Sequence, residues 1–133
     1  MEVLPAVHTV PSVGYAVTKG KGYWVFTGDT AHNPALWARL NQLDVSLLVI
    51  ETAFSERECD LAKRSAHLSP LVLAGELDCI EPGKTYPIYI THTKPAETEL
   101  IMTQVQRLDQ TSRPGLRAAH DIRCLRAGQE FEL

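Results

Sequence analysis

The chain has 133 residues, enough for a hydrophobic core, and we expect a single domain over 1–133. It is 44% hydrophobic and 22% charged with a net charge of −3, so neither nucleic acid nor a membrane is an expected partner. No apolar run approaches the roughly 20 residues of a membrane span, and no basic signal-peptide segment opens the chain. Three well-separated cysteines, Cys59, Cys79 and Cys124, indicate free thiols and a cytoplasmic location.

The first half of the chain predicts strands, one helix and a buried strand. Asn33 and Pro34 have the residue types of a helix N-cap and first helical position. Val45–Ile50 is nearly all apolar, which favours a strand buried on both faces. The turn residues 19–22 predict a hairpin. Three earlier strands are predicted, over Glu2–Val7, Val13–Thr18 and Tyr23–Thr27.

The second half alternates helices with strands. A buried strand is predicted over Pro87–Thr91, a loop over Arg113–Ala119, and a closing hairpin from Asp121–Leu125 and Glu130–Leu133. The order of these elements indicates an α/β fold with mixed strand directions. Helices are predicted over Glu56–Arg64, with Cys59, Leu61 and Ala62 facing inward, from Ser69-Pro70 through Leu77, and from Pro95 through Leu108.

Polar side chains follow four of the predicted strands, and these are His8, Asp29, Glu51 and His92. Groups at the carboxyl ends of strands gather at one edge of an open α/β sheet, and His67 lies in a loop that could reach the same edge. Imidazole nitrogens and carboxylate oxygens are ligands for zinc, iron or manganese. The alternatives stay open at this point, because a strand-end histidine is more often structural and Asp29 could cap a turn.

Five strings occur in order along the chain: HTVPSVGY, FTGDT, ETAF, SAHLSP and ITHTKP. Together they resemble the second half of the metallo-β-lactamase-fold phosphodiesterases, and the match covers roughly Val3 to Leu108. The class II 3′,5′-cyclic-nucleotide phosphodiesterases are the most similar branch, and the tRNA 3′-processing endonucleases are more distant. The resemblance implies an α/β fold that is half of an αββα sandwich, a mixed sheet with flanking helices. It also implies hydrolysis of cyclic nucleotides, with cAMP as substrate.

The resemblance implies a binuclear metal site, with zinc as the usual ion and manganese or iron as alternatives. His8 matches a ligand of the first metal, Asp29 the carboxylate that bridges both, and His92 a ligand of the second. His67 matches a histidine that protonates the leaving oxygen, and Glu51 an acidic residue that orients it. Lys94 is expected to be solvated rather than to contact phosphate.

The chain departs from this family at its most diagnostic motif, His-x-His-x-Asp-His, which occurs nowhere in the sequence. Without it each metal would keep only two protein ligands, His8 and Asp29 or Asp29 and His92. Zinc normally takes three or more. We therefore expect this chain to be the C-terminal half of a longer enzyme, with the N-terminal half absent, and to be inactive and metal-poor by itself.

A half-sandwich would leave one apolar face of its sheet uncovered, so the chain is expected to form a homo-oligomer or to pair with the missing half. Two other functions remain open. The chain could be a non-catalytic assembly module, or it could belong with the tRNA endonucleases. Against the second, residues 19–22 leave no room for the long clamping arm of those enzymes, and the net charge is acidic.

Overall fold

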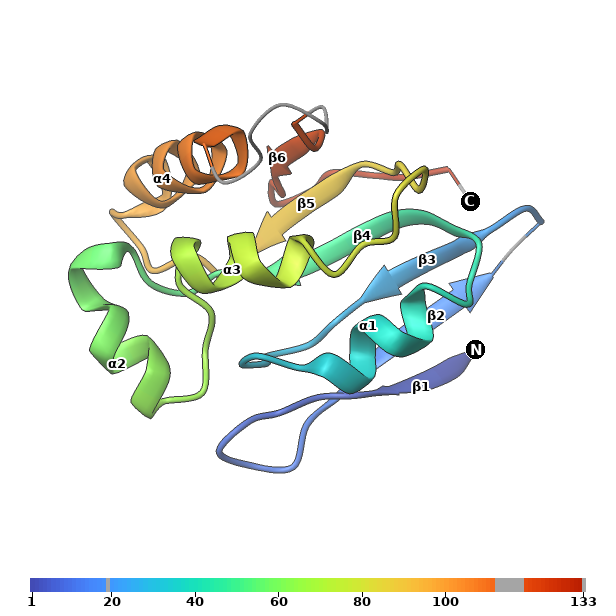
Figure 1. Ribbon diagram of the computed structural model, residues 1–133, viewed down its shortest axis with the longest axis horizontal. Coiled ribbons are helices and arrows are strands. Elements are labelled where there is room, and N and C mark those ends of the chain that lie inside the picture. The colour runs from blue at the N-terminus through green and yellow to red at the C-terminus, as the bar shows by residue number, and fades with distance from the viewer. Residues whose placement is uncertain (19, 112–118, 133) are drawn as a thin grey trace.

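The computed structural model describes residues 1–18, 20–111 and 119–132, and these contain a sheet of six strands with helices beside it (Figure 1). The strands are β1 (Glu2–Pro5), β2 (Val13–Thr18), β3 (Tyr23–Phe26), β4 (Val45–Glu51), β5 (Ile88–Thr91) and β6 (Ile122–Cys124). The helices are α1 (Pro34–Leu40), the short 3₁₀ helix η1 (Glu56–Glu58), α2 (Cys59–Arg64), α3 (Pro70–Leu77) and α4 (Thr98–Thr111).

The strands lie side by side in chain order, and only β2 among those described runs against the rest. It pairs antiparallel with both β1 and β3, which therefore share a direction. From β3 onward each pair of neighbours is parallel, through β4 and β5 to β6. The carboxyl ends of β1, β3, β4 and β5 consequently meet at one edge of the sheet, which is where ligands bind in open α/β folds.

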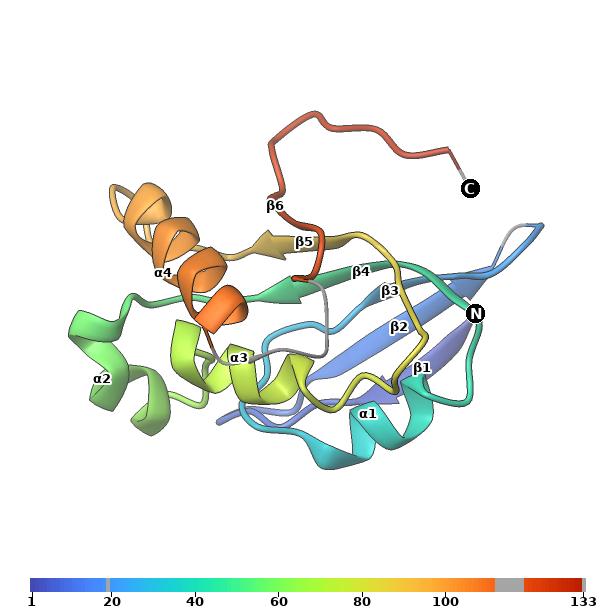
Figure 2. The same cartoon turned by 45° about the horizontal axis from the view of Figure 1, so that its top comes forward.

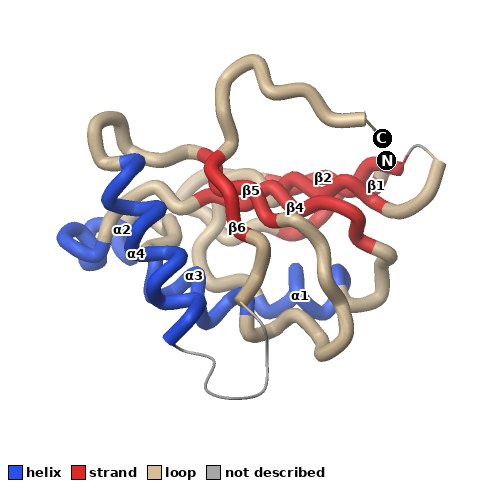
Figure 3. Tube along the Cα trace, turned by 90° about the horizontal axis from the view of Figure 1, so that it is seen from above, coloured by secondary structure: helices blue, strands red, loops and turns tan. Residues whose placement is uncertain are grey.

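The helices α1, α3 and α4 cover one face of the sheet, while the segment after β6 crosses the other (Figures 2 and 3). Burial of apolar side chains between these helices and the sheet supplies the main driving force for folding. The fully buried members of this core include Leu36, Trp37, Leu48, Ile50, Leu73, Leu77, Ile88, Ile90 and Ile101.

A second, smaller apolar cluster lies on the other face. It centres on Leu47, Val49 and Tyr89, with Leu125 and Phe131 packed against it from the C-terminal segment. The rings of Tyr89 and Phe131 are 4.9 Å apart in an edge-to-face contact. Toward β1 this face is open.

Two of the expected elements are corrected. No closing hairpin forms, since β6 pairs parallel with β5 and 130–132 are not a strand, while Leu133 lies outside the described residues. The segment that follows β6 instead gains burial by packing Phe131 on Tyr89. The last long helix begins at Thr98 rather than Pro95, because Ala96 has a left-handed backbone with φ of 66°.

The inward face of the charged helical segment is also corrected. Ala62 is buried, but Cys59 and Leu61 are exposed. The segment begins as the 3₁₀ helix η1 and becomes α-helical only from Cys59. Because a 3₁₀ helix has 3.0 residues per turn, its side chains point in directions that differ from those of one continuous α-helix. The expected loop over 113–119 lies outside the described residues apart from Ala119.

The three cysteines are free thiols, as expected. None of the described helices is both long and apolar enough to cross a bilayer.

Candidate active site

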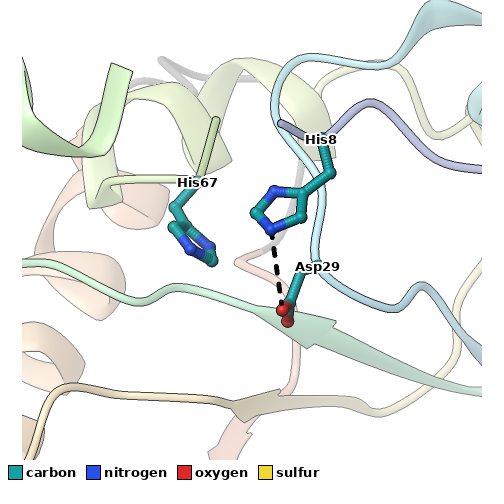
Figure 4. A group of neighbouring side chains, drawn as sticks. All are labelled: His8, Asp29 and His67. Carbon is teal, nitrogen blue, oxygen red and sulfur yellow. Dashed lines mark ion pairs between the residues drawn. The ribbon is translucent and has the colours of Figure 1, made fainter. Parts of the chain in front are cut away.

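The structure brings all five sequence-predicted site residues to the same edge of the sheet. His8 follows β1, Asp29 follows β3, Glu51 is the last residue of β4, and His92 follows β5. His67 comes from the loop between α2 and α3 and reaches the edge from the helical side. Figure 4 shows His8, Asp29 and His67 facing a common space. The expected convergence of these side chains therefore holds.

His8 is oriented by a backbone carbonyl. Its Nδ1 lies 3.0 Å from the carbonyl oxygen of Ala66, which can only accept a hydrogen bond. The proton of the neutral ring is therefore on Nδ1, and Nε2 keeps a free lone pair. This Nε2 atom lies 3.9 Å from Oδ2 of Asp29.

Asp29 owes its position to the glycine before it. Gly28 has φ of 66°, a left-handed conformation that glycine adopts without steric cost. A Cβ atom at Gly28 would lie 2.5 Å from the carbonyl oxygen of Val13, so the chain passes too close to β2 for any side chain. The Gly-Asp string is thus a sharp turn that ends β3 and delivers the carboxylate to the sheet edge.

Glu51 and His67 form a buried hydrogen-bonded pair. Oε1 of Glu51 lies 2.8 Å from Nδ1 of His67 and accepts a bond from the Thr30 N–H at 3.1 Å. Oε2 accepts bonds from the N–H groups of Ala53 and Leu68, at 3.1 and 3.3 Å. The carboxylate is only 1% exposed, so it is held rigidly and fixes the His67 ring.

The pKa values of this pair are shifted by burial. Desolvation raises the pKa of Glu51 to about 7, against the opposing effect of the Thr30 and Leu68 N–H bonds. Burial lowers the pKa of His67, and the nearby charge of His8 lowers it further, while Asp29 raises it. Around neutral pH the pair can hold or release a proton, as a general acid or base must.

His92 extends over the site from the end of β5. Its Nδ1 lies 4.0 Å from Oδ1 of Asp29, and its ring stacks on that of His67 with centroids 5.3 Å apart. Its backbone is left-handed, with φ of 58°, which is uncommon for a residue with a Cβ. Strained conformations of this kind gather at functional sites, and this one turns the imidazole toward Asp29.

Three further residues support the site, and sequence reasoning did not single them out. Phe54 packs its ring edge-to-face against His67, with centroids 5.8 Å apart. Ala66 supplies the carbonyl that orients His8 and has a left-handed φ of 57°. Thr30 accepts a bond from the Val7 N–H at 3.1 Å and so ties the two loops together. Phe54 and Ala66 fall inside the strings ETAF and SAHLSP, but their residue types carry no chemical signal.

The remaining histidines serve the scaffold. His32 bonds to the buried carboxylate of Glu76, and His120 to that of Asp109 at 2.7 Å. Lys94 is exposed, as expected, and its ammonium pairs with both carboxylate oxygens of Glu58, at 2.9 and 2.8 Å.

The donor set suits a divalent transition metal. His8, Asp29 and His67 each offer one ligand atom, and these atoms lie within 4.8 Å of one another. Two imidazole nitrogens and a carboxylate oxygen are ligands that zinc, iron and manganese accept. His92 provides a third imidazole beside them.

Comparison with known proteins finds no matching family model and no matching curated protein, but it does find similar solved structures. The metallo-β-lactamase fold protein YhfI from Bacillus subtilis has a TM-score of 0.72 and 14% identity, over 98% of this chain and 48% of its own. Unliganded yeast PDE1 has a TM-score of 0.66 and 17% identity, over 89% and 41%. Human tRNase Z, short form (ELAC1), has a TM-score of 0.56 and 20% identity, over 71% and 36%.

The chain therefore spans about half the length of the YhfI chain and a smaller share of the other two proteins. At such identities the likeness concerns the fold. The mixed sheet with its flanking helices is that of about half of a metallo-β-lactamase-fold protein.

Proposed function

We propose that this chain carries part of the active site of a metal-dependent phosphodiesterase that hydrolyses 3′,5′-cyclic nucleotides, cAMP foremost, to 5′-nucleotides. The observation that carries the proposal is the convergence of three histidines and two carboxylates at the ligand-binding edge of a metallo-β-lactamase fold. The strings that resemble the cyclic-nucleotide branch run through this same edge.

In this proposal His8, Asp29 and His92 would hold two metal ions, with Asp29 serving both and zinc as the preferred ion. The contacts of Asp29 support this arrangement, because its two oxygens face different histidines, Oδ2 toward His8 and Oδ1 toward His92. When bound, such ions lower the pKa of a bound water and neutralise the phosphate oxygens.

His67 is the proposed proton donor for the 3′-oxygen of the substrate. An alkoxide is a poor leaving group, so a proton delivered as the P–O bond breaks lowers the barrier. Glu51 holds the ring through Nδ1, which leaves Nε2 to face the substrate. Phe54 restricts the ring from one side.

A second candidate function is RNA 3′-end processing, favoured by the similarity to human tRNase Z. Two features of this chain oppose it. β2 ends at Thr18 and β3 begins at Tyr23, so the connection between them is short. The net charge of −3 also gives no general attraction for RNA.

The test is an assay of 5′-AMP formation from cAMP, with zinc or manganese supplied. The chain is assayed alone and with a second polypeptide that carries a His-x-His-x-Asp-His segment. We expect hydrolysis only in the mixture, and its loss in Asp29→Ala but not in His32→Ala, whose ring lies away from the site on Glu76. Cleavage of a tRNA precursor without cAMP hydrolysis would favour the second function, and neither activity would favour an assembly module.

A further inference from the structure

The candidate metal ligands differ in how close their ligand atoms lie to one another. Among the described residues, the three whose ligand atoms all lie within 4.8 Å of one another are His8, Asp29 and His67. We propose that the chain by itself holds one divalent transition metal ion between these three side chains, with His67 as a ligand in that state. The inference rests on the proposed function only for the assignment of His8 and Asp29 to a metal.

The imidazoles of His8 and His67 already make the supporting hydrogen bonds that are typical of metal-binding histidines. A ligating histidine usually donates its second ring N–H to a backbone carbonyl or a carboxylate, which fixes the tautomer and the ring. His8 makes the first kind of contact, from Nδ1 to the Ala66 carbonyl at 3.0 Å. His67 makes the second kind, from Nδ1 to Glu51 at 2.8 Å. In both rings Nε2 is left as the available ligand atom.

The ring planes suit a shared ion for His8 and His67 but not for His67 and His92. A histidine lone pair lies in the plane of its ring, so two rings stacked face to face do not direct their lone pairs at one ion. The planes of His8 and His67 are inclined by 63°, with centroids 4.8 Å apart. The rings of His67 and His92 are instead stacked at 24°, so their lone pairs run side by side.

Burial also distinguishes His8 and His67 from His92. The side chains of His8 and His67 are 11% and 13% exposed, whereas that of His92 is 52% exposed. In the described part of the chain the His92 ring stacks on His67 but has no hydrogen bond like those that hold His8 on Ala66 and His67 on Glu51. His8 and His67 are therefore preorganised, and His92 is the side chain that would have to be ordered at a cost in entropy.

Metal binding would require only a small contraction. Ligand atoms of a tetrahedral zinc ion with bonds of 2.0–2.1 Å are about 3.4 Å apart. The largest separation, within 4.8 Å, would therefore shorten by up to about 1.4 Å, mainly through movement of Asp29, the most exposed of the three. Three protein ligands with one open position is the number found in catalytic zinc sites.

This site has a consequence for the proposed reaction. A ligating Nε2 cannot also carry a proton, so His67 is unavailable as a proton donor while it binds the ion. Hydrolysis then requires other ligands to take the place of His67 on the metal. The chain by itself is accordingly a metal-binding but inactive form.

The test is titration of the metal-free, full 133-residue chain with Zn²⁺ by calorimetry and with Co²⁺ by visible absorption. We expect one ion per chain. His67→Ala should weaken binding by about 100-fold or more, and Glu51→Gln by about tenfold, because one removes a ligand and the other its support. His92→Ala and the distant control His32→Ala should change affinity by less than about threefold. Circular dichroism checks that each variant folds.

A readout that needs no variant keeps the inference testable if a variant misfolds. Nitrogen NMR of the imidazoles in the wild-type chain should show Zn²⁺ shifting Nε2 of His8 and His67, with His92 unchanged. Loss of binding in His92→Ala would overturn the inference, as would two ions per chain or a shift of His92 Nε2. Absence of binding would also overturn it. None of these results decides the proposed function, which the cAMP assay of the completed site tests separately.

Discussion

Glu51 is the least exposed ionisable side chain of the candidate site, and its carboxylate accepts four hydrogen bonds. Those bonds do not remove the cost of desolvation, because burial still raises its pKa from 4.5 to about 7. The folded chain therefore holds a proton between pH 4.5 and 7 that the unfolded chain has released. The stabilisation from this group is complete below pH 4.5 and is lost as the pH rises to about 7.

This difference is measurable in Glu51→Gln, which cannot titrate. Relative to this variant, we expect the metal-free wild-type chain to lose about 3 kcal/mol of unfolding free energy between pH 4.5 and 7.5, at 1.36 kcal/mol for each unit of pKa shift. Urea unfolding of both proteins across this range tests the expectation. Parallel curves would mean that Glu51 titrates with an ordinary pKa.

His67 provides a kinetic prediction in the active, completed enzyme. His67→Ala should slow hydrolysis of cAMP by about 100-fold or more, the usual contribution of a general acid. An aryl phosphodiester leaves as a phenolate that needs little protonation, so its rate should fall much less. Initial rates on both substrates give the ratio. Equal losses would assign His67 to positioning rather than to proton transfer.

Gly28 is the residue on which the placement of Asp29 depends. Gly28→Ala imposes a left-handed backbone on alanine and also forces Cβ to 2.5 Å from the Val13 oxygen. Gly83→Ala is the matched control, since Gly83 has φ of 89° but an added Cβ meets nothing within 4 Å. The control should lose about 1 kcal/mol of unfolding free energy, and Gly28→Ala about 1–3 kcal/mol more. Similar losses of unfolding free energy in the two variants would mean that the contact of Cβ with the Val13 oxygen does not destabilise the fold.

At the scale of elements, the start of α1 is fastened to the β1 side of the sheet by one side chain. Asn33 accepts a bond from the Leu36 N–H at 3.3 Å as the helix cap, and its amide donates to the carbonyl oxygen of Pro5 at 2.9 Å. It is almost fully buried. The N-cap therefore also anchors the strand that leads to His8.

Removing this side chain should cost more than removing an ordinary cap. Asn33→Ala is expected to lower the unfolding free energy by about 2–3 kcal/mol, from the cap and from the unpaired Pro5 carbonyl. Ser69 is the matched control, as it occupies the N-cap of α3 without a side-chain capping bond. Ser69→Ala should change stability by about 0.5 kcal/mol or less. Thermal unfolding of both variants measures the two losses of unfolding free energy. Equal losses would contradict the role of Asn33 as both helix cap and anchor of β1.

At the scale of the whole molecule, one face of the sheet carries none of the described helices. Register places Val3, Tyr15 and Phe26 side by side on this face, in line with Val49 and Tyr89. The C-terminal segment covers the β5 end, but Val3 is 58% exposed at the β1 end. We propose that the open part packs against a second apolar layer, supplied by the polypeptide that completes the metal site or, without it, by another copy of this chain.

Sedimentation over a range of concentrations tests this proposal on the chain alone. The average mass should rise toward a dimer, and Val3→Glu should abolish the rise by placing a charge in the contact. Leu71→Glu is the control, because Leu71 is equally exposed but lies on α3, on the helical side. A monomer at all concentrations, or equal effects of both variants, would contradict the proposal.

The parts of the structure that local patterns encode could be predicted from the sequence. The run Val45–Ile50 is apolar except at Ser46, and it forms most of β4, which is buried except at Ser46. Asn33-Pro34 begins a helix, as capping chemistry requires. Because polar residues follow apolar strands at His8, Asp29 and His92, the topology of parallel strand ends suffices to predict that they meet.

Other features depend on contacts between residues far apart in the chain. The pattern over Asp121–Leu125 and Glu130–Leu133 predicted a hairpin, but the burial of Phe131 against Tyr89 outweighs it. Likewise no local pattern shows that the Ala66 carbonyl holds His8, or that Glu51 holds His67. The sequence by itself determined that His8, Asp29 and His92 reach one edge of the sheet, through backbone preferences and apolar periodicity. Only the tertiary structure decided which nitrogen each histidine presents there, because that follows from partners brought together by packing.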